Sequence, residues 1–307
     1  MSLTIEQFDD PLNPRGWAVE PVRRRIELQY PDADWRLRPV GMVESWDAYD
    51  GAEVPGGRSG MAAVCARLGE THPMPIDEYL WFDDPPTSSW PACRAVAAAA
   101  IQGAAPGRRL LRSLREATFL RRLSVDDDDV RASLIEAVPG LDAQRVAEAL
   151  ANGEADERFE AARSAAADLD VPGAARTAGR CELPAFVVRA AGEARAVSGL
   201  VDVEEFRATI DAVADVEPAA VTLDVEAALE RYSPEGWIAR AELSRLTGVE
   251  GAAAADEARR LVEGGDVVET AFAAEAFWRT AEYAPAAGDD EGDGGADGER
   301  GADAGGT

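Results

Sequence analysis

The chain contains no lysine: all 31 of its basic residues are arginine, against 58 aspartates and glutamates, and the formal net charge is −27. An acidic surface keeps proteins hydrated and apart where salt screens charge over a few ångströms. The composition therefore resembles that of a halophilic protein, although a GC-rich genome that writes Arg for Lys would produce the same bias. Because phosphate neutralisation needs a basic face, the charge argues against a nucleic-acid partner.

Cysteine and histidine are also scarce. The three cysteines, Cys65, Cys93 and Cys181, are widely spaced and odd in number, so they indicate neither a disulfide framework nor a Cys-x-x-Cys pair. With His72 as the single histidine, a Cys/His zinc site is not expected. The acidic run at 126–129 lacks the spacing and closing glutamate of a calcium loop and indicates the start of a helix. We predict no metal site.

Long apolar runs are missing as well. No stretch approaches ~20 residues without charge, proline or glycine, so we expect no membrane span. Residues 1–6 show no basic segment followed by an apolar run, so we expect no secretory signal. The hydrophobic content of 46% is enough for a core, and 307 residues suggest about two domains. We therefore expect a cytoplasmic protein.

The first forty residues predict a β-α-β unit. Residues 3–9 form a β-prone run, residues 14–29 place apolar side chains at helical spacing, and residues 34–40 alternate apolar with polar. Pro21 lies inside the predicted helix, so we expect a kink there. Of the arginines at 23–25, we expect one to face the edge of the core and two to face solvent, paired with neighbouring glutamates.

A helical insertion of about residues 44–170 follows. It opens with an irregular segment rich in Gly, Pro and Trp that contains one short helical piece at 60–68. Turn and cap residues then separate five predicted helices. Their ranges are 92–101, 107–120, 126–137, 142–152 and 153–169.

The sheet is predicted to resume after Gly179. Residues 184–189 and 195–199 read as a hairpin, and residues 203–213 read as a closing amphipathic helix. The order β-α-β, helical insertion, β-β-α assigns residues 1–215 to one α/β domain.

Residues 222–282 predict a second, smaller domain after a linker at 216–220. Three helices followed by a two-stranded hairpin is winged-helix order. The predicted third helix carries as many acids as bases, so we favour a packing or protein–protein module and keep DNA binding as the minority reading. Residues 284–307 consist almost entirely of Gly, Ala, Asp and Glu, and we expect a disordered acidic tail.

Three segments in this order resemble the DsbA-type thioredoxin fold over about residues 3–213. They are FDDPLNPRGWAVEPVRRRIELQYPDADWRLRPVG, SSWPACRAVAAAAIQG…LLRSLREATFL and LPAFVVRAAGEARAVSG. The chain resembles a haloarchaeal type of the cytoplasmic branch that includes 2-hydroxychromene-2-carboxylate isomerases and kappa-class glutathione transferases. The resemblance implies a thioredoxin-like α/β fold with a helical insertion and disulfide-oxidoreductase ancestry.

The resemblance also implies where an active site would lie. In the family a cysteine pair opens the first helix, and a cis-proline loop packs against it. By position, Asn13 and Gly16 replace the two cysteines around Pro14 and Arg15, and Leu183–Pro184 matches the cis-proline loop. The isomerase and transferase relatives use a serine at the first position to hold a glutathione thiolate. The loss of both sulfur atoms argues against dithiol–disulfide exchange in this chain.

Each candidate site residue has a structural and a functional interpretation. Asn13 either caps the helix, with Pro14 in its first turn, or hydrogen-bonds an anionic or thiol ligand. The Leu183–Pro184 loop is either a structural turn or an edge that pairs with an extended peptide. Cys181 is either a small buried hydrophobe or a lone thiol that forms a mixed disulfide.

The leading hypothesis is a thioredoxin-like protein with a degenerate active site that binds a thiol compound or an extended peptide through Asn13, Leu183 and Pro184. One alternative is an isomerase or transferase that depends on a thiol cofactor. Another is a ligand-responsive regulator that acts through the winged-helix domain. No cofactor is predicted apart from a low-molecular-weight thiol as a candidate, and the sequence does not specify an oligomeric state.

Overall fold

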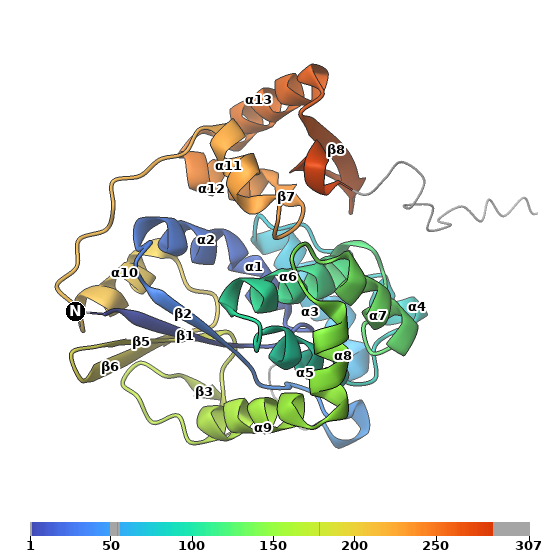
Figure 1. Cartoon of the computed structure of the whole chain (residues 1–307), viewed down its shortest axis with the longest axis vertical. Helices are drawn as coiled ribbons and strands as arrows, with labels where there is room; N and C mark the ends of the chain where they lie inside the picture. Colours follow the sequence, from blue (N-terminus) through green and yellow to red (C-terminus); the bar gives the residue numbers. More distant parts are fainter. Residues whose placement is uncertain (1, 50–53, 55, 178, 285–307) are drawn as a thin grey trace, which may run out of the picture.

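A four-stranded mixed sheet forms the centre of the N-terminal part of this computed structural model, which describes residues 2–49, 54, 56–177 and 179–284. The strand order is β2-β1-β5-β6, with β1 parallel to β2 and antiparallel to β5 (Figure 1). The strands are β1 (Thr4–Asp9), β2 (Asp34–Pro39), β5 (Ala185–Ala190) and β6 (Glu193–Ser198). The predicted β-α-β unit and the later hairpin are thus both present.

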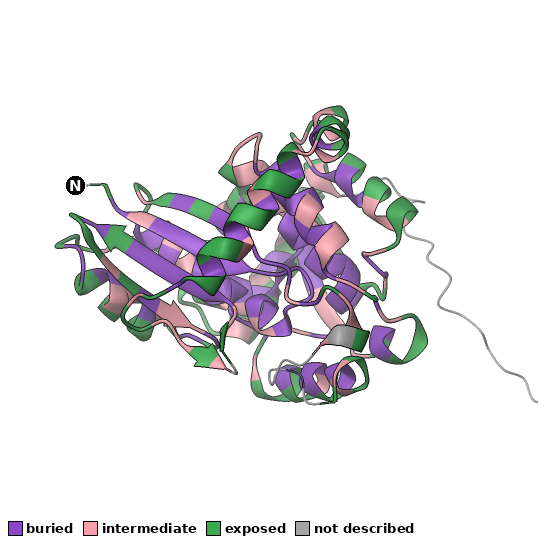
Figure 2. Cartoon of the chain, turned by 90° about the horizontal axis from the view of Figure 1, so that it is seen from below, coloured by how far each residue is buried: buried purple, intermediate pink, exposed green. Residues whose placement is uncertain are grey.

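Alternating side chains bury both faces of the sheet, as the purple central strands in Figure 2 show. Ile5 and Phe186 pack on one face beneath α2 (Glu20–Gln29) and α10 (Val203–Asp211). Phe8 packs on the other face with residues of α9. Burial on both faces fixes the register, because a slip of one residue would send these side chains to the wrong side.

The helix predicted over residues 14–29 is two helices. α1 (Pro14–Ala18) ends at Val19, and α2 begins at Glu20 with Pro21 in its first turn. Pro21 has no N–H to donate to the preceding turn, and its ring crowds the carbonyl four residues earlier. The expected kink is therefore a full break between two helices.

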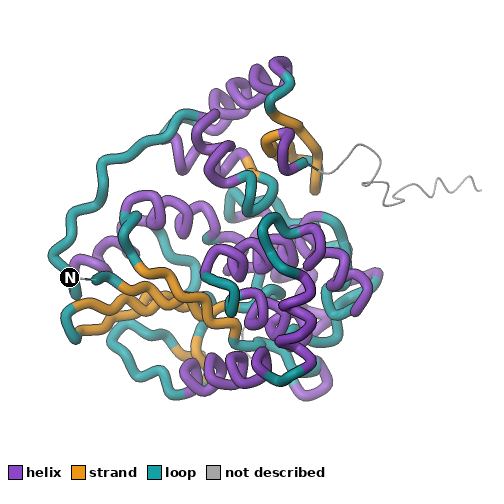
Figure 3. Tube along the Cα trace, viewed as in Figure 1, coloured by secondary structure: helices purple, strands orange, loops and turns teal. Residues whose placement is uncertain are grey.

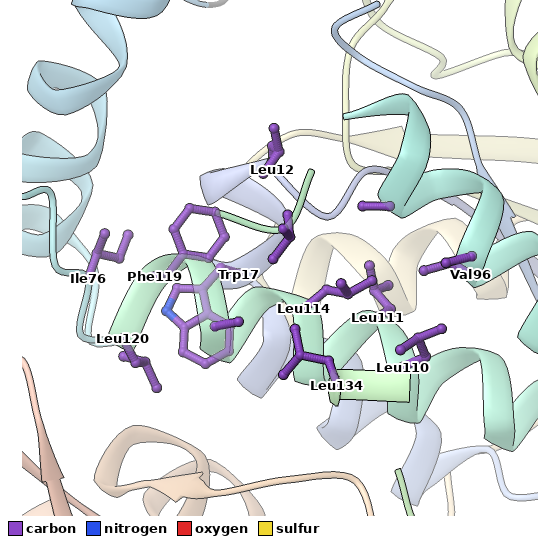
Figure 4. Packing of buried hydrophobic residues seen from close by; sticks show 14 of the residues in the cluster. Leu12, Trp17, Ile76, Val96, Leu110, Leu111, Leu114, Phe119, Leu120 and Leu134 are labelled. Carbon is purple, nitrogen blue, oxygen red and sulfur yellow. The ribbon is translucent and has the colours of Figure 1, made fainter. Parts of the chain in front are cut away.

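The insertion contains the helical piece predicted at 60–68, the five further predicted helices, and one short helix, α4, that the sequence pattern did not reveal. The helices are α3 (Arg58–Thr71), α4 (Leu80–Asp83), α5 (Trp90–Ala99), α6 (Ala104–Leu120), α7 (Asp128–Ala137), α8 (Ala143–Ala151) and α9 (Glu154–Ala167), after a 3₁₀ turn (Trp46–Ala48). Trp17 of α1 packs among Leu114 and Phe119 of α6, which joins the insertion to the sheet (Figure 4). Among the described residues, no helix is long and apolar enough to cross a bilayer.

Two further groups of strands lie outside the central sheet. A two-stranded hairpin of β3 (Arg176–Thr177) and β4 (Arg180–Cys181) precedes β5 and was not predicted. The C-terminal unit contains a three-stranded sheet of order β7-β9-β8. Its elements are α11 (Val225–Tyr232), β7 (Ile238–Ala239), α12 (Arg240–Thr247), α13 (Gly251–Gly264), β8 (Val267–Phe272), β9 (Glu275–Thr280) and a 3₁₀ turn (Ala281–Tyr283).

The C-terminal unit packs directly on the N-terminal part. A long loop leads from α10 to α11 along one side of the molecule (Figure 3). Trp237 and Phe277 belong to the same apolar cluster as Trp17, and Leu28 of α2 lies in the core of the C-terminal unit. The two parts therefore share buried surface. The predicted acidic tail lies outside the described residues, apart from residue 284.

A buried ion-pair network runs through this junction and corrects the expectation for the arginines at 23–25. Arg23 and Arg24 are 3% and 0% exposed, because the C-terminal unit covers them. Arg24 lies 2.8 Å from Glu242 of α12, and both side chains are fully buried. Arg23 donates to Glu235 at 3.0 Å. Two of the three arginines are thus interface residues rather than solvated ones, which a reading of the helix alone could not show.

Candidate functional site

Asn13 is the N-cap of α1. Its Oδ1 accepts a hydrogen bond from the Arg15 N–H at 3.1 Å, and its Nδ2 donates to Oδ1 of Asp9 at 3.0 Å. The side chain is 3% exposed. The capping interpretation of Asn13 therefore describes its geometry, and both ends of its amide group already have partners within the protein.

Gly16, which the sequence resemblance matches to the second family cysteine, has no space for a side chain. A β-carbon on Gly16 would overlap Nη2 of Arg115 and would stand 2.5 Å from Oδ1 of Asp9. Arg115 and Asp9 form an ion pair with side chains that are 1% and 0% exposed. A charged pair from α6 and the end of β1 thus fills the space beside Gly16.

Asp10 holds the loop before α1 in place. Its carboxylate accepts hydrogen bonds from the Leu12 N–H at 2.7 Å and from the Ser89 hydroxyl at 2.6 Å, and also from the Met42 N–H. Burial raises the pKa of Asp10, although these hydrogen bonds oppose the increase. The Asp10 side chain therefore ties β1, the segment after β2 and the start of α5 into one frame around the site.

All three cysteines are free thiols, and two of them are sealed in the interior. Burial raises the pKa of Cys65 to about 12, and burial beside the Asp10 carboxylate also raises the pKa of Cys93. Neither thiol is available as a nucleophile, because the thiolate is the reactive form. Cys65 and Cys93 both lie in the hydrophobic core.

A cavity of about 240 Å³ lies beside the N-terminus of α1. It brings together three of the predicted site residues, Asn13, Cys181 and Leu183. Gly16 and Pro184 are buried behind the wall and do not line it. The described lining residues are Asn13, Pro14, Arg15, Val40, Gly41, Met42, Val54, Val64, Arg163, Ala166, Ala167, Arg176, Gly179, Arg180, Cys181 and Leu183.

Leu183 is one of the residues that line this cavity. Its peptide bond to Pro184 is cis. The neighbours are paired, since the Glu182 N–H donates to Ala175 and the Pro184 carbonyl accepts from the Gly199 N–H. Within the described part of the chain, the N–H and carbonyl of Leu183 have no backbone partner. This residue therefore keeps hydrogen-bonding capacity at the cavity.

Cys181 is partly buried at the same wall. Burial raises the pKa of its thiol, and a weak hydrogen bond runs from Sγ to the Glu182 carbonyl at 3.7 Å. At neutral pH the group is therefore mainly a thiol rather than a thiolate.

Four arginines lie together on the cavity wall, and the sequence did not predict that they would meet there. Arg15 and Arg163 pair with Glu182 at 2.8 Å and Glu160 at 2.9 Å, respectively. Arg180 donates to the Met42 carbonyl at 3.0 Å. The fourth, Arg176, donates to main-chain carbonyls. No local motif marks them, because they come from α1, α9 and the β3–β4 hairpin.

The remaining sequence predictions concern metal and histidine chemistry. Among the described residues, no group of three or more His, Cys, Asp or Glu side chains is arranged to hold a metal ion. Asp127 caps α7 by accepting hydrogen bonds from two backbone N–H groups, as an acidic helix start does. His72 is the C-cap residue of α3, and its ring contacts the hydroxyl of Thr71.

Comparison with known proteins points to one family. The family model described as Thioredoxin matches residues 7–175, which is more than half of the chain. A ClpXP adapter protein, SpxH of Halalkalibacterium halodurans, is 33% identical over 175 residues, which are 55% of this chain and 56% of that protein. The chain spans about half the length of the curated relatives it matches.

Solved structures support the same fold. A Nitrosomonas europaea protein assigned to the disulfide isomerases superposes with a TM-score of 0.56 at 17% identity, covering 69% of this chain and 97% of that one. The cytosolic disulfide reductase DsbM of Pseudomonas aeruginosa superposes with a TM-score of 0.50 at 17% identity, covering 68% and 94%. At this identity the likeness shows a thioredoxin-like fold with DsbA-like neighbours, and nothing about activity.

Proposed function

The chain belongs to the thioredoxin family, and we propose that it is a binding protein of that family, which holds an extended segment of a partner protein in the cavity beside α1. In this proposal the DsbA-type active site is degenerate and exchanges no disulfides. Leu183 and the loop at Pro184 position the segment, and Asn13 supports them by capping the start of α1 beside the cavity.

The structural use of positions 13 and 16 carries the proposal. Disulfide exchange needs a thiolate that attacks and a second sulfur atom that resolves the mixed disulfide. Asn13 is occupied as a helix cap, and the space at Gly16 is filled by Arg115 and Asp9. With Cys65 and Cys93 sealed in the core, Cys181 alone remains near the cavity, and one thiol cannot complete a dithiol cycle.

The cavity wall suits an extended peptide. Leu183 offers a backbone N–H and carbonyl of the kind that pair with an added strand, and strand addition gives affinity through main-chain hydrogen bonds. Val40, Val54 and Val64 supply apolar surface for a side chain of that strand. The curated relatives are named adapter proteins, and because an adapter holds a protein partner, we extend the proposal to an adapter role for this chain.

A cavity-filling variant tests this function. Ala167 is exposed at the cavity wall on α9, whereas Ala165 is exposed on the same helix outside the wall. Peptides selected from a random displayed library are measured by fluorescence polarisation. We expect Ala167→Trp to weaken binding at least about tenfold and Ala165→Trp to leave it unchanged. Equal binding by both variants, or insulin reduction by the wild-type protein, would contradict the proposal.

A small thiol is the second candidate ligand, because Cys181 lines the same cavity. A thiol-dependent isomerase or transferase would need Asn13 to orient that thiol, but both ends of the Asn13 amide are occupied and the pKa of Cys181 is raised by burial. Glutathione should therefore leave the melting temperature unchanged in a thermal-shift assay. A saturable increase that Asn13→Ala abolishes would favour the enzyme instead.

For the C-terminal unit we propose a winged-helix-like domain at about residues 222–282 that packs against the rest of the chain and contacts proteins rather than DNA. Its element order supports the assignment. On α13, Arg259 pairs with Asp256 and Arg260 pairs with Glu257, so the helix offers no uncompensated basic face. A salt-dependent gel shift on duplex DNA would overturn the proposal that this domain contacts proteins rather than DNA. It would favour the alternative of a ligand-responsive regulator.

We also propose a salt-rich cytoplasm as the setting. The net charge of −27 destabilises the compact state through self-repulsion, which salt screens. The free energy of unfolding should therefore rise with added KCl up to molar concentration. A protein that is most stable at low salt would contradict the halophilic assignment.

A further inference from the structure

Over the described residues, the charge of the cavity wall is opposite to that of the chain. Of the described residues that line the cavity, four are arginine and none is acidic, although the whole chain has 58 acids against 31 bases. The arginines converge on the cavity from α1, α9 and the β3–β4 hairpin. A cavity wall of this kind concentrates positive potential where a ligand would lie.

Arg176 carries the least compensated of these charges. Its guanidinium donates to the carbonyls of Ala167 at 3.1 Å and Leu169 at 3.4 Å, and also to that of Gly179. In the described part of the chain, no carboxylate forms an ion pair with it. Carbonyl dipoles orient the group but leave its full positive charge at the wall.

Arg15 and Arg163 have acidic partners that stand outside the wall. The side chains in the pair of Arg15 with Glu182 are 28% and 27% exposed, and those in the pair of Arg163 with Glu160 are 34% and 54% exposed. Ion pairs this exposed are weak, so a ligand carboxylate can compete for either arginine. Arg163 also stacks over the Trp90 ring at 4.1 Å, which holds its planar donor groups in one orientation.

Much of the rest of the described wall is apolar, with Val40, Val54, Val64 and Leu183 among its residues. A ligand that fits both parts has an apolar side chain with carboxylates beside it. We propose, on the basis of the proposed function, that the partner segment is an acidic peptide with one apolar anchor between Asp or Glu residues. The chain's own residues 285–307 are rich in Asp and Glu but have no apolar side chain larger than proline, so they lack such an anchor.

Matched synthetic peptides test the proposal. Three capped, fluorescein-labelled nonapeptides carry a central leucine flanked by Glu, Gln or Lys, and their affinities for the full-length protein are measured by fluorescence polarisation. Arginine–carboxylate hydrogen bonds are about twice as strong as neutral ones, so the Glu peptide should bind about tenfold more tightly than the Gln peptide. The Lys peptide should bind most weakly.

Two failures are distinguishable. If the Gln or Lys peptide binds as tightly as the Glu peptide, the acidic preference is wrong while peptide binding stands. If none of the three binds, and no library-selected peptide binds either, the proposed function is wrong and the inference falls with it.

Variants that release arginines give a gain of binding, which misfolding cannot mimic. Glu160→Gln and Glu182→Gln should each raise the affinity for the Glu peptide about threefold, because each removes a carboxylate that competes for an arginine of the wall. Glu157→Gln changes the charge of α9 equally at an exposed residue outside the wall, and should have no effect. Arg176→Gln should lower the affinity for the Glu peptide about tenfold and leave the affinity for the Gln peptide unchanged. Unchanged affinity in Glu160→Gln, Glu182→Gln and Arg176→Gln would overturn the proposal.

Discussion

The guanidinium of Arg115 occupies the space that a side chain on Gly16 would need. Arg115 belongs to α6 in the helical insertion, so a side chain of the insertion contacts the first helix next to the candidate site. The ion pair of Arg115 with Asp9 is almost fully buried. The space beside Gly16 is therefore filled by a charged pair, and under the proposed function a cysteine placed there would have to displace it.

We predict that Asn13→Cys/Gly16→Cys destabilises the protein by about 3 kcal/mol, because the new side chain at position 16 displaces a buried ion pair. Urea unfolding measures the loss, and insulin reduction should stay at background. The single change Asn13→Cys is the control, since it adds no atoms at position 16. A double variant that folds with wild-type stability and reduces insulin would contradict this prediction, because it would show that the site accepts two cysteines without losing stability.

A second prediction concerns the helix cap. Asn13→Ala removes the acceptor for the Arg15 N–H and the donor to Asp9, so it should cost about 1–2 kcal/mol in urea unfolding. Asn13→Asp keeps a capping oxygen but sets a second carboxylate beside Asp9. It should therefore be the less stable of the two at neutral pH and should recover when the pH is lowered. If the two variants were equally stable at every pH, the contact with Asp9 would be unimportant.

Local patterns account for what the sequence could predict. The capping role of Asn13, the strand alternation around Ile5 and Phe8 and the helix periods of the insertion all depend on neighbours within a few residues. Pro21 predicted a bend correctly, but not that the bend would be a full break between two helices at Val19.

The features that the sequence could not predict arise mainly where segments far apart in the chain come into contact. The short α4 and the β3–β4 hairpin carry too few residues for a period to emerge. The arginine wall joins Arg15 to Arg163 and Arg176, which only the folded chain brings together. Arg24 reads as a surface residue on its own helix, and its burial follows from the docking of α12.

The third prediction tests that docking. Glu242 is fully buried between Arg24 at 2.8 Å and Arg112 at 3.0 Å, so Glu242→Ala leaves two buried guanidinium groups without this partner. We expect a loss of about 3–5 kcal/mol in the free energy of unfolding. Asp34→Ala breaks the half-exposed pair with Arg36 and should cost less than about 0.5 kcal/mol. Similar losses in both variants would mean that the junction contributes little.

The fourth prediction concerns acid sensitivity. Burial alone would raise the pKa of Glu20, but attraction to Arg23 and Arg24 holds it well below its usual 4.5. A carboxyl group with a lowered folded-state pKa binds fewer protons in the folded than in the unfolded protein, so its contribution is present above pH 4.5 and is lost as the pH falls below that value. Glu20→Gln should lower the free energy of unfolding at pH 7. As the pH falls from about 6 to 3, the variant should lose less of its free energy of unfolding than the wild type does. Parallel pH profiles for the two proteins would contradict this assignment.

The last prediction uses the thiols as reporters of the cavity. Cys65 and Cys93 are 0% exposed, whereas Cys181 lines the cavity, so one thiol per chain should react with an aromatic disulfide reagent in the folded protein and three should react in denaturant. Because burial raises the pKa of Cys181, its reaction should be slower than that of free cysteine at the same pH. Cys181→Ala should abolish labelling of the folded protein, and a bound peptide should slow it in the wild type. A saturating peptide that leaves the rate unchanged would place the bound segment away from this wall.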